Sequence, residues 1–406
     1  MKRYISGIPV TDVKDILQDG QDYILILDEG SIDFLEEIEK RQPTVVLSDY
    51  SLAFSHVPSF LQMVSIPLFF IPENRERTYE TYHERKASID GSIVTGTKST
   101  LEEIRGLEYI TVDTFYSIVF PGTAQAYCGQ ENATRIDLPD DFEVHMSIKS
   151  KHEPNAIDVD ADGVGLIFTE LIFFENHRYP RHFEQREIFQ KIFLRNKSEK
   201  YTVRLFDINY DKIPKWLQGI RLGNYDRPLF ERFFRFYLDE QLRCICDLAK
   251  SEEYSISILI PFVRNIDDVI YIRECVDSCK SAYRERIKIG AMIENVAVIS
   301  EIPDMHNDID YFSVGSNDFI NSFLEAKRTD ILTPVQLSRI IRDGELWELL
   351  SKIKQLAGSK PIRICGQLPI FPEALEKLVN IGYKRFTVSP QWVKQLKYQI
   401  FNLYSQ

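Results

Sequence analysis

The first 110 residues alternate short apolar runs with turn-forming segments, which is the pattern of a small α/β domain. The runs predict three strands and two helices: strands at 23–27 (YILIL), 44–48 (TVVLS) and 67–71 (PLFFI), and helices at 31–39 (SIDFLEEIE) and 58–64 (PSFLQMV). A turn at Asp90 leads into a closing strand in the segment DGSIVTG. His56 stands just before the second helix, where a histidine can be structural or reactive. We predict a compact domain over residues 1–110.

The rest of the chain begins with a linker and continues as a regular succession of strands and helices. Residues 111–140 have weak periodicity and many turn formers, which suits a linker. Eight apolar or β-branched runs then predict strands: VHMSIK (from Val144), VGLIFT (Val164), TVRLFDI (Thr202), ISILIPFV (Ile256), IKIGAMIE (Ile287), DYFSVGS (Asp310), IRICG (Ile362) and RFTVS (Arg385). Eight strands with helical crossovers in about 260 residues are typical of a (β/α)8 TIM barrel. We predict this α/β barrel over residues 141–406.

Composition and charge exclude several classes of partner. The chain has 406 residues and a formal net charge of −12, which argues against a nucleic acid or an anionic membrane as the main partner. Its apolar runs are all shorter than the ~18 residues of a membrane span. Six cysteines in a chain of this length do not make a disulfide framework, so we expect a cytoplasmic protein.

Polar and reactive side chains follow most of the predicted barrel strands. In a TIM barrel these carboxyl ends carry the chemistry. The residues found there are Thr169–Glu170, Arg204, Asp207, Pro261, Glu294, Asn317–Asp318 and Cys365. Glu294 and Asp318 offer hard oxygen ligands of the kind that Mg²⁺ prefers, and Arg204 and Arg328 could flank an anionic substrate. The alternative is that the acidic residues only cap helix N-termini, but charged groups at most strand ends favour a site.

Six stretches in both predicted domains, FSH at His56 and then DGVGLIFTE, VRLFDINYDK, IGAMIENVAV, DYFSVGSNDFINSFLEAKR and ICGQLP, follow one another in the chain. Together they resemble the phosphoenolpyruvate-utilising family, which includes Enzyme I of the sugar phosphotransferase system, pyruvate phosphate dikinase and phosphoenolpyruvate synthase. The sequence FSH, which ends at His56, and Ile66–Pro67 are similar to the family's Thr-Ser-His signature and the Gly-Ile-Pro-like segment after it. Five barrel stretches are similar to further motifs of the family. DGVGLIFTE is similar to the strand that ends in Arg-Thr-Glu, VRLFDINYDK to Arg-Thr-Leu-Asp, and IGAMIENVAV to Gly-Val-Met-Val-Glu-Thr-Pro. DYFSVGSNDFINSFLEAKR is similar to Asp-Phe-Phe-Ser-Ile-Gly-Thr-Asn-Asp-Leu with a downstream Arg, and ICGQLP to Cys-Gly-Glu. Six motifs in family order are a specific signal.

The resemblance implies a role for each matching residue. The first domain would be a swivelling phosphohistidine-type domain whose carrier is His56, and Cys365 would protonate the enolate carbon to give pyruvate. The remaining roles concern ligands: Glu294 and Asp318 would hold Mg²⁺, while Arg204, Arg221, Asn317 and Arg328 would bind phosphoenolpyruvate. The implied partners are phosphoenolpyruvate, pyruvate or a related keto acid, and a second copy of the chain that associates through the barrel.

The chain also departs from the family pattern. Phe168 replaces the arginine of Arg-Thr-Glu, Gln367 replaces the glutamate of Cys-Gly-Glu, and Lys327 replaces an acidic residue before Arg328. A lost charge-assisted phosphate contact is worth about 1.5–3 kcal/mol, so we expect another cation, Lys327 or Lys212, to supply the charge.

Three functions are consistent with these patterns. The first is transfer of a phosphoryl group between phosphoenolpyruvate and His56. Because we expect no ATP-grasp domain in this chain, a separate ATP-grasp or acceptor protein would then supply or receive the phosphate. The second is a Mg²⁺-dependent lyase that enolises or cleaves a 2-oxo acid, with His56 idle; Phe168 favours this function because such substrates carry no phosphate. The third is a non-catalytic regulatory module that binds a keto acid.

Overall fold

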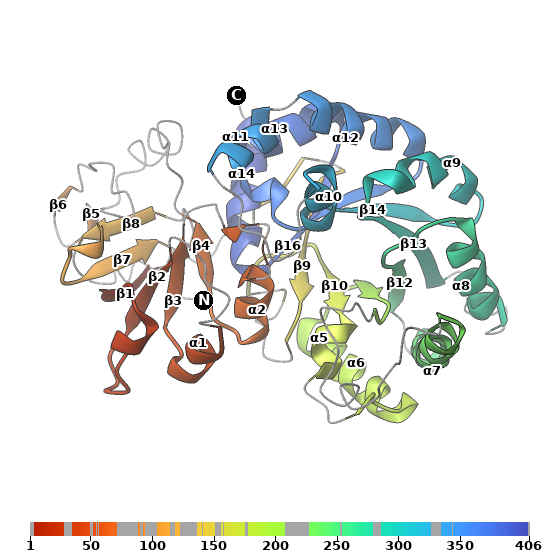
Figure 1. Cartoon of the computed structure of the whole chain (residues 1–406), viewed down its shortest axis with the longest axis horizontal. Coiled ribbons are helices and arrows are strands. Elements are labelled where there is room, and N and C mark those ends of the chain that lie inside the picture. The colour runs from red at the N-terminus through yellow and green to blue at the C-terminus, as the bar shows by residue number, and fades with distance from the viewer. Residues whose placement is uncertain are drawn as a thin grey trace.

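An open sheet and a closed barrel are the two main parts of the chain (Figure 1). The computed structural model describes residues 4–27, 35–48, 52–53, 55, 57–70, 88–89, 92–93, 104–113, 118–121, 136–139, 141–150, 156, 158–174, 178–207, 227–251, 254–278, 286–325, 334–342 and 344–404. The predicted α/β fold class is confirmed.

The open sheet has six strands in the order β4-β3-β2-β1-β7-β8. Their bounds are β1 (Tyr4–Val10), β2 (Tyr23–Leu27), β3 (Val45–Ser48), β4 (Leu68–Phe70), β7 (Ile110–Asp113) and β8 (Ile118–Pro121). Strands β1 to β4 run parallel, β7 pairs with β1 in antiparallel orientation, and β8 pairs with β7 in antiparallel orientation. The three predicted strands correspond to β2, β3 and β4. The two predicted helices correspond to α1 (Leu35–Arg41) and α2 (Val57–Met63), although the expected start of α1 lies outside the described residues.

Three strands of the open sheet, β1, β7 and β8, were not predicted. β1 has Gly7 and Pro9 in its sequence, and both residues weaken a strand pattern. Gly7 is required because a Cβ there would lie 2.6 Å from the carbonyl oxygen of Asp22 on the neighbouring chain segment. β7 begins at the end of the predicted domain, and β8 lies inside the range 111–140 in which we expect a linker. The segment predicted to close the sheet instead contributes to a short hairpin of β5 (Ser88–Ile89) and β6 (Ser92–Ile93).

All eight predicted barrel strands are present, and they close in the order β10-β11-β12-β13-β14-β15-β16-β9. Their bounds are β9 (Glu143–Ile148), β10 (Gly163–Phe168), β11 (Lys200–Arg204), β12 (Ser255–Ile260), β13 (Ile287–Ile293), β14 (Tyr311–Gly315), β15 (Ile362–Cys365) and β16 (Arg385–Val388). Each strand pairs in parallel with both neighbours. Their carboxyl ends therefore meet at one end of the barrel, where a functional site is expected.

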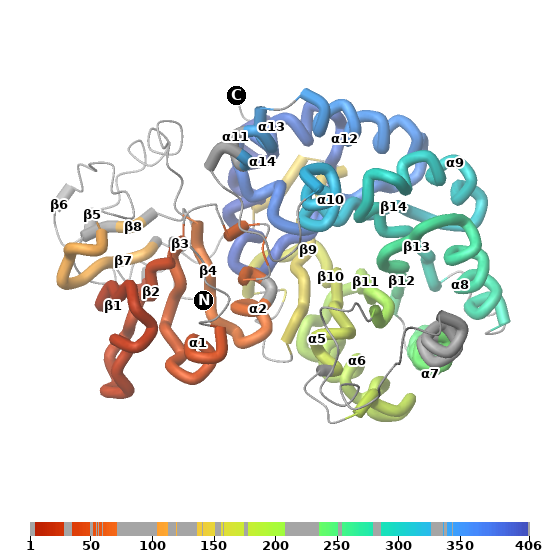
Figure 2. The backbone as a smooth tube through the Cα atoms, viewed as in Figure 1, coloured from red at the N-terminus to blue at the C-terminus, as the bar shows by residue number. Residues whose placement is uncertain are grey.

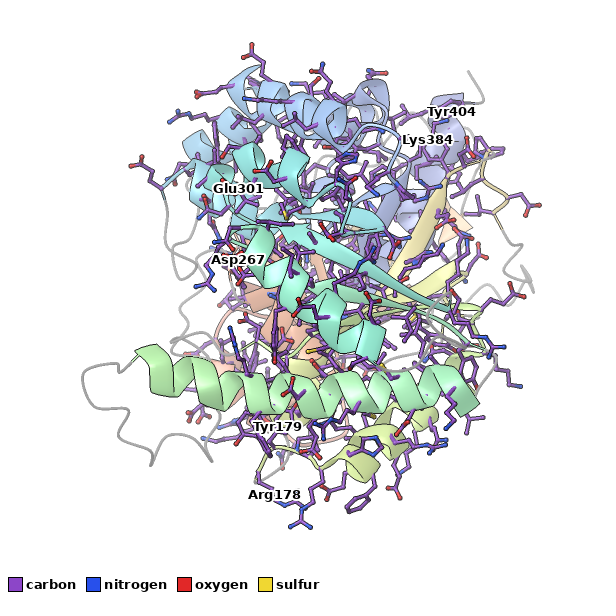
Figure 3. The ribbon with its side chains drawn as sticks, turned by 90° about the vertical axis from the view of Figure 1, so that its right-hand side faces the viewer. Arg178, Tyr179, Asp267, Glu301, Lys384 and Tyr404 are labelled. Atoms are coloured by element: carbon purple, nitrogen blue, oxygen red, sulfur yellow. The ribbon has the colours of Figure 1, made fainter. Side chains whose placement is uncertain are left out.

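Helices surround the barrel and return the chain from one strand to the next (Figure 2). Their bounds are α5 (Thr169–Phe174), α6 (His182–Asn196), α7 (Arg227–Ser251), α8 (Ile266–Ser278), α9 (Ile302–Met305), α10 (Ser316–Phe323), α11 (Pro334–Arg342), α12 (Gly344–Ala357), α13 (Pro372–Ile381) and α14 (Val393–Tyr404). Figure 3 shows the longest of them, α7, with Tyr179 beside it. The Tyr179 hydroxyl donates to the backbone oxygen of Tyr237 on α7 at 2.9 Å. Among the described helices, none has the length and apolar character that crossing a membrane requires.

A charged layer fills the amino-terminal end of the barrel, opposite the expected site. Glu143 contacts His145 at 3.2 Å and Arg363 at 3.2 Å. Burial, reinforced by the charge of Arg363 and opposed by Glu143, lowers the pKa of His145 to about 3. The ring is therefore neutral at physiological pH, and Gly163 leaves the space that it fills. This histidine has a structural role in the packing of the barrel end.

Helix α2 joins the open sheet to the barrel, and it lies between the sheet and β9 in Figure 1. The buried Gln62 side chain donates to the backbone oxygen of Ser147 at 3.2 Å, and the Ser389 hydroxyl donates to Gln62 Oε1 at 2.8 Å. Next to this junction, Phe69 and Phe70 of β4 pack against Trp392 with ring centroids 5.7 and 5.8 Å apart. A polar clamp and an aromatic contact thus hold this part of the chain against the carboxyl-terminal end of β9.

Candidate active site

A cavity opens at the carboxyl ends of the barrel strands, and its volume is about 760 Å³ when counted out to its open mouth. Five residues predicted from the sequence line it together: Arg204, Glu294, Asn317, Asp318 and Cys365. They come from β11, β13, α10 and β15 or from positions directly after these elements. Because the parallel strands end at the same rim of the barrel, residues that lie up to 161 positions apart in the sequence meet in one site.

Three other predicted site residues lie outside the described part of the chain. They are His56, Arg221 and Arg328. Lys212 and Lys327, the two candidates for a compensating cation, also lie outside it. Ser55, which precedes His56 in the sequence, is described, is buried, and lines the same cavity as the barrel residues.

Arg204 is the central cation of the site and is almost fully buried. Its guanidinium contacts Glu170 at 2.5 Å, Glu294 at 3.4 Å and Asp207 at 3.8 Å. Burial alone would lower the pKa of Arg204, but the carboxylates of Glu170 and Glu294 outweigh it and hold that pKa above its usual value. The Thr169 hydroxyl donates to the Arg204 backbone oxygen at 2.8 Å and so ties the start of α5 to β11. Arg204 therefore remains charged and fixed in orientation.

Among the residues that the structure describes, Glu294 and Asp318 are the two carboxylates that line the cavity. Glu294 follows β13 and is buried, while Asp318 lies in the first turn of α10 after β14. Within the described residues there is no group of three or more metal-binding side chains that could enclose a metal ion. Mg²⁺ does not require such a group, since it is commonly held by one or two carboxylates together with substrate oxygens and water. The oxygen donors of Glu294 and Asp318 fit that mode of binding.

Asn317 is positioned by the turn that follows β15. Its Oδ1 accepts from the backbone N–H of Gln367 at 2.8 Å, and this bond fixes the side-chain amide at the cavity wall. The turn depends on Gly366, which has a φ of +110°. A Cβ at Gly366 would also lie 2.5 Å from Asn317 Oδ1 and from the Ser316 hydroxyl. The loop between β15 and the following helix thus needs glycine at this position.

Cys365 ends β15 and is buried beside the carboxylates. Its thiol donates to the backbone oxygen of Val314 at 3.3 Å, and the Ser313 hydroxyl lies 3.6 Å from the sulfur. Burial, with a further contribution from Glu294, raises the pKa of Cys365 to about 12, against a lowering effect of Ser313. The group is therefore a protonated thiol at neutral pH. It is suited to donate a proton and not to act as a thiolate nucleophile.

The high pKa of Cys365 predicts an unusual pH dependence of alkylation. At pH 8 we expect iodoacetamide to label Cys365 at least about 100-fold more slowly than the cysteine of an unstructured peptide, because only the thiolate reacts. The rate at Cys365 should keep rising about tenfold per pH unit from pH 8 to 10, whereas an ordinary thiol approaches a plateau near pH 9. Mass spectrometry on the labelled protein and on the labelled peptide measures both rates. A plateau for Cys365 below pH 10 would contradict the assignment.

The sequence analysis did not identify Lys149 as a site residue. Lys149 directly follows β9, is buried, and lines the cavity. Its Nζ lies 5.1 Å from the ring centroid of Phe168, and the Arg204 guanidinium lies 5.3 Å from the same ring. Lys149 could have been predicted in the same way as the other residues, because it stands at the carboxyl end of the predicted strand that begins at Val144. Phe168 thus lies at the carboxyl end of β10, where the resemblance predicts an arginine. Its ring lies between the cations Lys149 and Arg204 on one side and the barrel interior on the other.

A closed parallel barrel with carboxylates, an arginine, an amide and a thiol at its carboxyl ends defines the class of (β/α)8 barrels that carry a polar site at this rim. Comparison of the sequence with known families narrows this class. The family described as "PEP-utilising enzyme, PEP-binding domain" matches residues 129–404, which is more than half of the chain. The chain belongs to this family, and the resemblance found in the sequence analysis is confirmed.

Relatives of the chain are bacterial and archaeal proteins of low sequence identity. "Phosphoenolpyruvate-dependent phosphotransferase system" of Escherichia coli (strain K12) is 22% identical over 404 residues, which are 93% of this chain and 51% of that protein. The protein of the same name from Salmonella typhimurium is 27% identical over 252 residues, 58% of this chain and 33% of that protein. "Phosphoenolpyruvate-protein phosphotransferase" of Haloferax volcanii is 26% identical over 258 residues, 60% of this chain and 45% of that protein. The chain thus spans about half or less of these relatives.

Proposed function

We propose that the barrel binds phosphoenolpyruvate and that the chain passes its phosphoryl group to His56. One observation supports this proposal above the others: the cavity that gathers the five predicted barrel residues is also lined by Ser55, the neighbour of His56 in the sequence. Two segments that the resemblance assigns to opposite steps of one transfer therefore contribute to a single site. The names of the relatives describe phosphotransfer from phosphoenolpyruvate, which is consistent with it.

Each described site residue has a role in this reaction. Bound Mg²⁺ would neutralise charge on the phosphate and on the enolate. Glu294 and Asp318 would hold it, and the fixed amide of Asn317 would donate a hydrogen bond to the substrate. Arg204 is oriented by Glu170 and would face the developing enolate charge. These groups are positioned before the substrate binds, so little reorganisation is needed during the reaction.

The bonds, electrons and protons of the proposed transfer balance without any reactant other than phosphoenolpyruvate, His56, Cys365 and solvent. A ring nitrogen of neutral His56 attacks phosphorus, the bond from phosphorus to the enol oxygen breaks, and its electron pair stays on that oxygen as an enolate. The enolate carbon takes a proton from the Cys365 thiol and becomes the methyl group of pyruvate. The imidazole releases its ring proton to solvent, and the thiolate regains one from solvent. Because the pKa of Cys365 is about 12, the thiol is protonated again before the next cycle.

The hydrogen bonds of Gln62 hold α2 at the carboxyl end of the barrel, and this position matters for the proposed transfer. Gln62 lies on the helix that follows His56 in the sequence, and its amide is hydrogen-bonded to Ser147 and Ser389 at the rim of the cavity. We propose that this contact holds the carrier segment over the barrel during transfer. Passing the phosphoryl group to an acceptor on another chain would require the clamp to open, and we propose that the hinge for this movement lies in the predicted linker, residues 111–140.

A single-turnover assay tests the proposed function. Wild-type protein mixed with Mg²⁺ and excess phosphoenolpyruvate should release about one pyruvate per chain and then stop, because the phosphorylated carrier has no acceptor. His56→Ala should release none and still bind the substrate. Continuous turnover without an acceptor, or equal release from the His56→Ala variant, would overturn the proposal.

A second candidate function is a Mg²⁺-dependent lyase acting on a 2-oxo acid. The observation that favours it is Phe168, since an apolar ring at this strand end offers no charge to a phosphate. A lyase would consume a 2-oxo acid with Mg²⁺ and would be unaffected by His56→Ala. The same assay therefore separates the two functions.

A further inference from the structure

We infer that the site accepts 2-oxo acids, and their enol phosphates, that carry a small apolar group on C3, the carbon that becomes the methyl group of pyruvate. The inference rests on the proposed function and deepens it by naming a wider substrate class. It begins with an apolar surface in the cavity, which we call the C3 wall. Four side chains that line the cavity make up this wall: Leu166, Phe168, Met292 and Cys365.

The C3 wall is built from three strands of the barrel. Leu166 and Phe168 lie on β10, Met292 lies on β13, and Cys365 ends β15. Leu166, Met292 and Cys365 are buried and belong to one hydrophobic cluster inside the barrel. The ring of Phe168 is only partly buried and packs against that cluster. The wall is therefore a packed apolar surface next to the polar groups of the cavity.

Protonation by Cys365 places C3 of the substrate at this wall. The step forms a C–H bond at C3, breaks the S–H bond and leaves its electron pair on sulfur, so C3 must come within about 3.5 Å of Sγ. A carbon attached to C3 is about 1.5 Å further away and lies within about 5 Å of Sγ. The side chains packed around Cys365 are then its neighbours. C3 is also the one end of phosphoenolpyruvate that carries no polar atom.

The chemistry of the C3 wall selects an apolar group over a polar one. A methyl group that packs on the wall leaves water, which raises affinity by about fourfold. A hydroxyl in the same place would lose water, and Leu166, Phe168 and Met292 offer it no strong hydrogen bond. Phe168 is decisive, because the arginine that the resemblance predicts at this strand end would bring charge and N–H donors to the wall.

Three 2-oxo acids test the inference by isothermal titration in the presence of Mg²⁺. Relative to pyruvate, 2-oxobutyrate adds a methyl group on C3, and 3-hydroxypyruvate adds a hydroxyl of similar size. Wild-type protein should bind 2-oxobutyrate about two- to fivefold more tightly than pyruvate. It should bind 2-oxobutyrate about 10- to 100-fold more tightly than 3-hydroxypyruvate. None of the three carries a phosphate, so the result does not depend on transfer to His56.

Two substitutions of Phe168 test its part in the selection. Phe168→Leu keeps an apolar side chain and should retain a preference of at least about tenfold for 2-oxobutyrate over 3-hydroxypyruvate. Phe168→Arg should reduce that preference to less than about threefold, because the hydroxyl gains a donor and the methyl group loses an apolar neighbour. The matched control is Phe142→Leu at the amino-terminal end of the barrel, where Phe142 packs on Tyr404. It should leave all three affinities unchanged, and thermal unfolding shows whether each variant is folded.

Equal binding of 2-oxobutyrate and 3-hydroxypyruvate by wild-type protein would overturn the inference. A preference that Phe168→Arg leaves unchanged would do the same. Binding of pyruvate with exclusion of 2-oxobutyrate would also overturn it, because the wall would then close on an unsubstituted C3. These results leave the proposed transfer standing, since the single-turnover assay with phosphoenolpyruvate tests it separately. No pyruvate release in that assay, together with the expected order of the three acids, would overturn the transfer to His56 alone.

Discussion

Asp318→Asn is expected to lower Mg²⁺-dependent phosphoenolpyruvate binding by about 100-fold or more. The substitution keeps the shape of the side chain and removes one of two anionic ligands from the metal site. Metal ions supply several kcal/mol of charge stabilisation to such substrates, and each 1.4 kcal/mol corresponds to a factor of ten. Isothermal titration at fixed Mg²⁺ measures the effect, and the loss should become smaller as the Mg²⁺ concentration rises.

Asp318 is a cleaner position for this experiment than Glu294. Glu294 also contacts Arg204 at 3.4 Å, so Glu294→Gln would disturb an internal ion pair together with the metal site. A matched control is Asp268→Asn, which removes a carboxylate paired with Arg264 at the surface, outside the lining of the cavity. If Asp318→Asn and Asp268→Asn bind Mg²⁺ and phosphoenolpyruvate alike, the metal assignment is wrong.

Arg204→Met is expected to destabilise the chain by about 3–5 kcal/mol. The substitution leaves the buried carboxylates of Glu170 and Glu294 without their shared cation, and breaking a buried ion pair from one side carries a penalty of this size. Chemical denaturation monitored by circular dichroism measures the free energy of unfolding.

Two variants check the cause of this loss. Glu170→Gln in the Arg204→Met background should recover part of the stability, because it removes one uncompensated charge. Arg178→Met is the control at the surface, where Arg178 makes a two-pronged contact with Glu184 and is half exposed (Figure 3). It should change the unfolding midpoint only slightly. If the two arginine variants were equally stable, the internal charge network would not hold the site together.

The barrel was predictable from sequence because its strands are continuous apolar runs buried on both faces. Runs such as IKIGAMIE and ISILIPFV have a clear length and recur with helical spacers. β1 was not predictable in this way, because Gly7 and Pro9 interrupt its pattern and its place depends on a close approach to Asp22. Local pattern carries no information about such a long-range contact.

In the candidate site, too, some features were predictable from local sequence and others depend on contacts between distant segments. Arg204, Glu294, Asn317, Asp318 and Cys365 could be placed together because parallel strands bring their carboxyl ends to one rim. The neighbourhood of Lys149 and Phe168 depends on side-chain packing between β9 and β10, which no sequence spacing specifies. The pKa of Cys365 also depends on burial and on Glu294 from another strand. Sequence therefore predicted the residues of the rim, but not the contacts that set their chemistry.

Intact-mass analysis after incubation with phosphoenolpyruvate and Mg²⁺ tests the central claim most directly. The account predicts that wild-type protein gains the mass of one phosphoryl group, that the group is acid-labile, and that peptide mapping places it on His56. The His56→Ala variant should gain nothing under the same conditions, and Asp318→Asn should gain it far more slowly. Pyruvate formation without any gain in mass, or a phosphoryl group on a residue other than His56, would contradict the account.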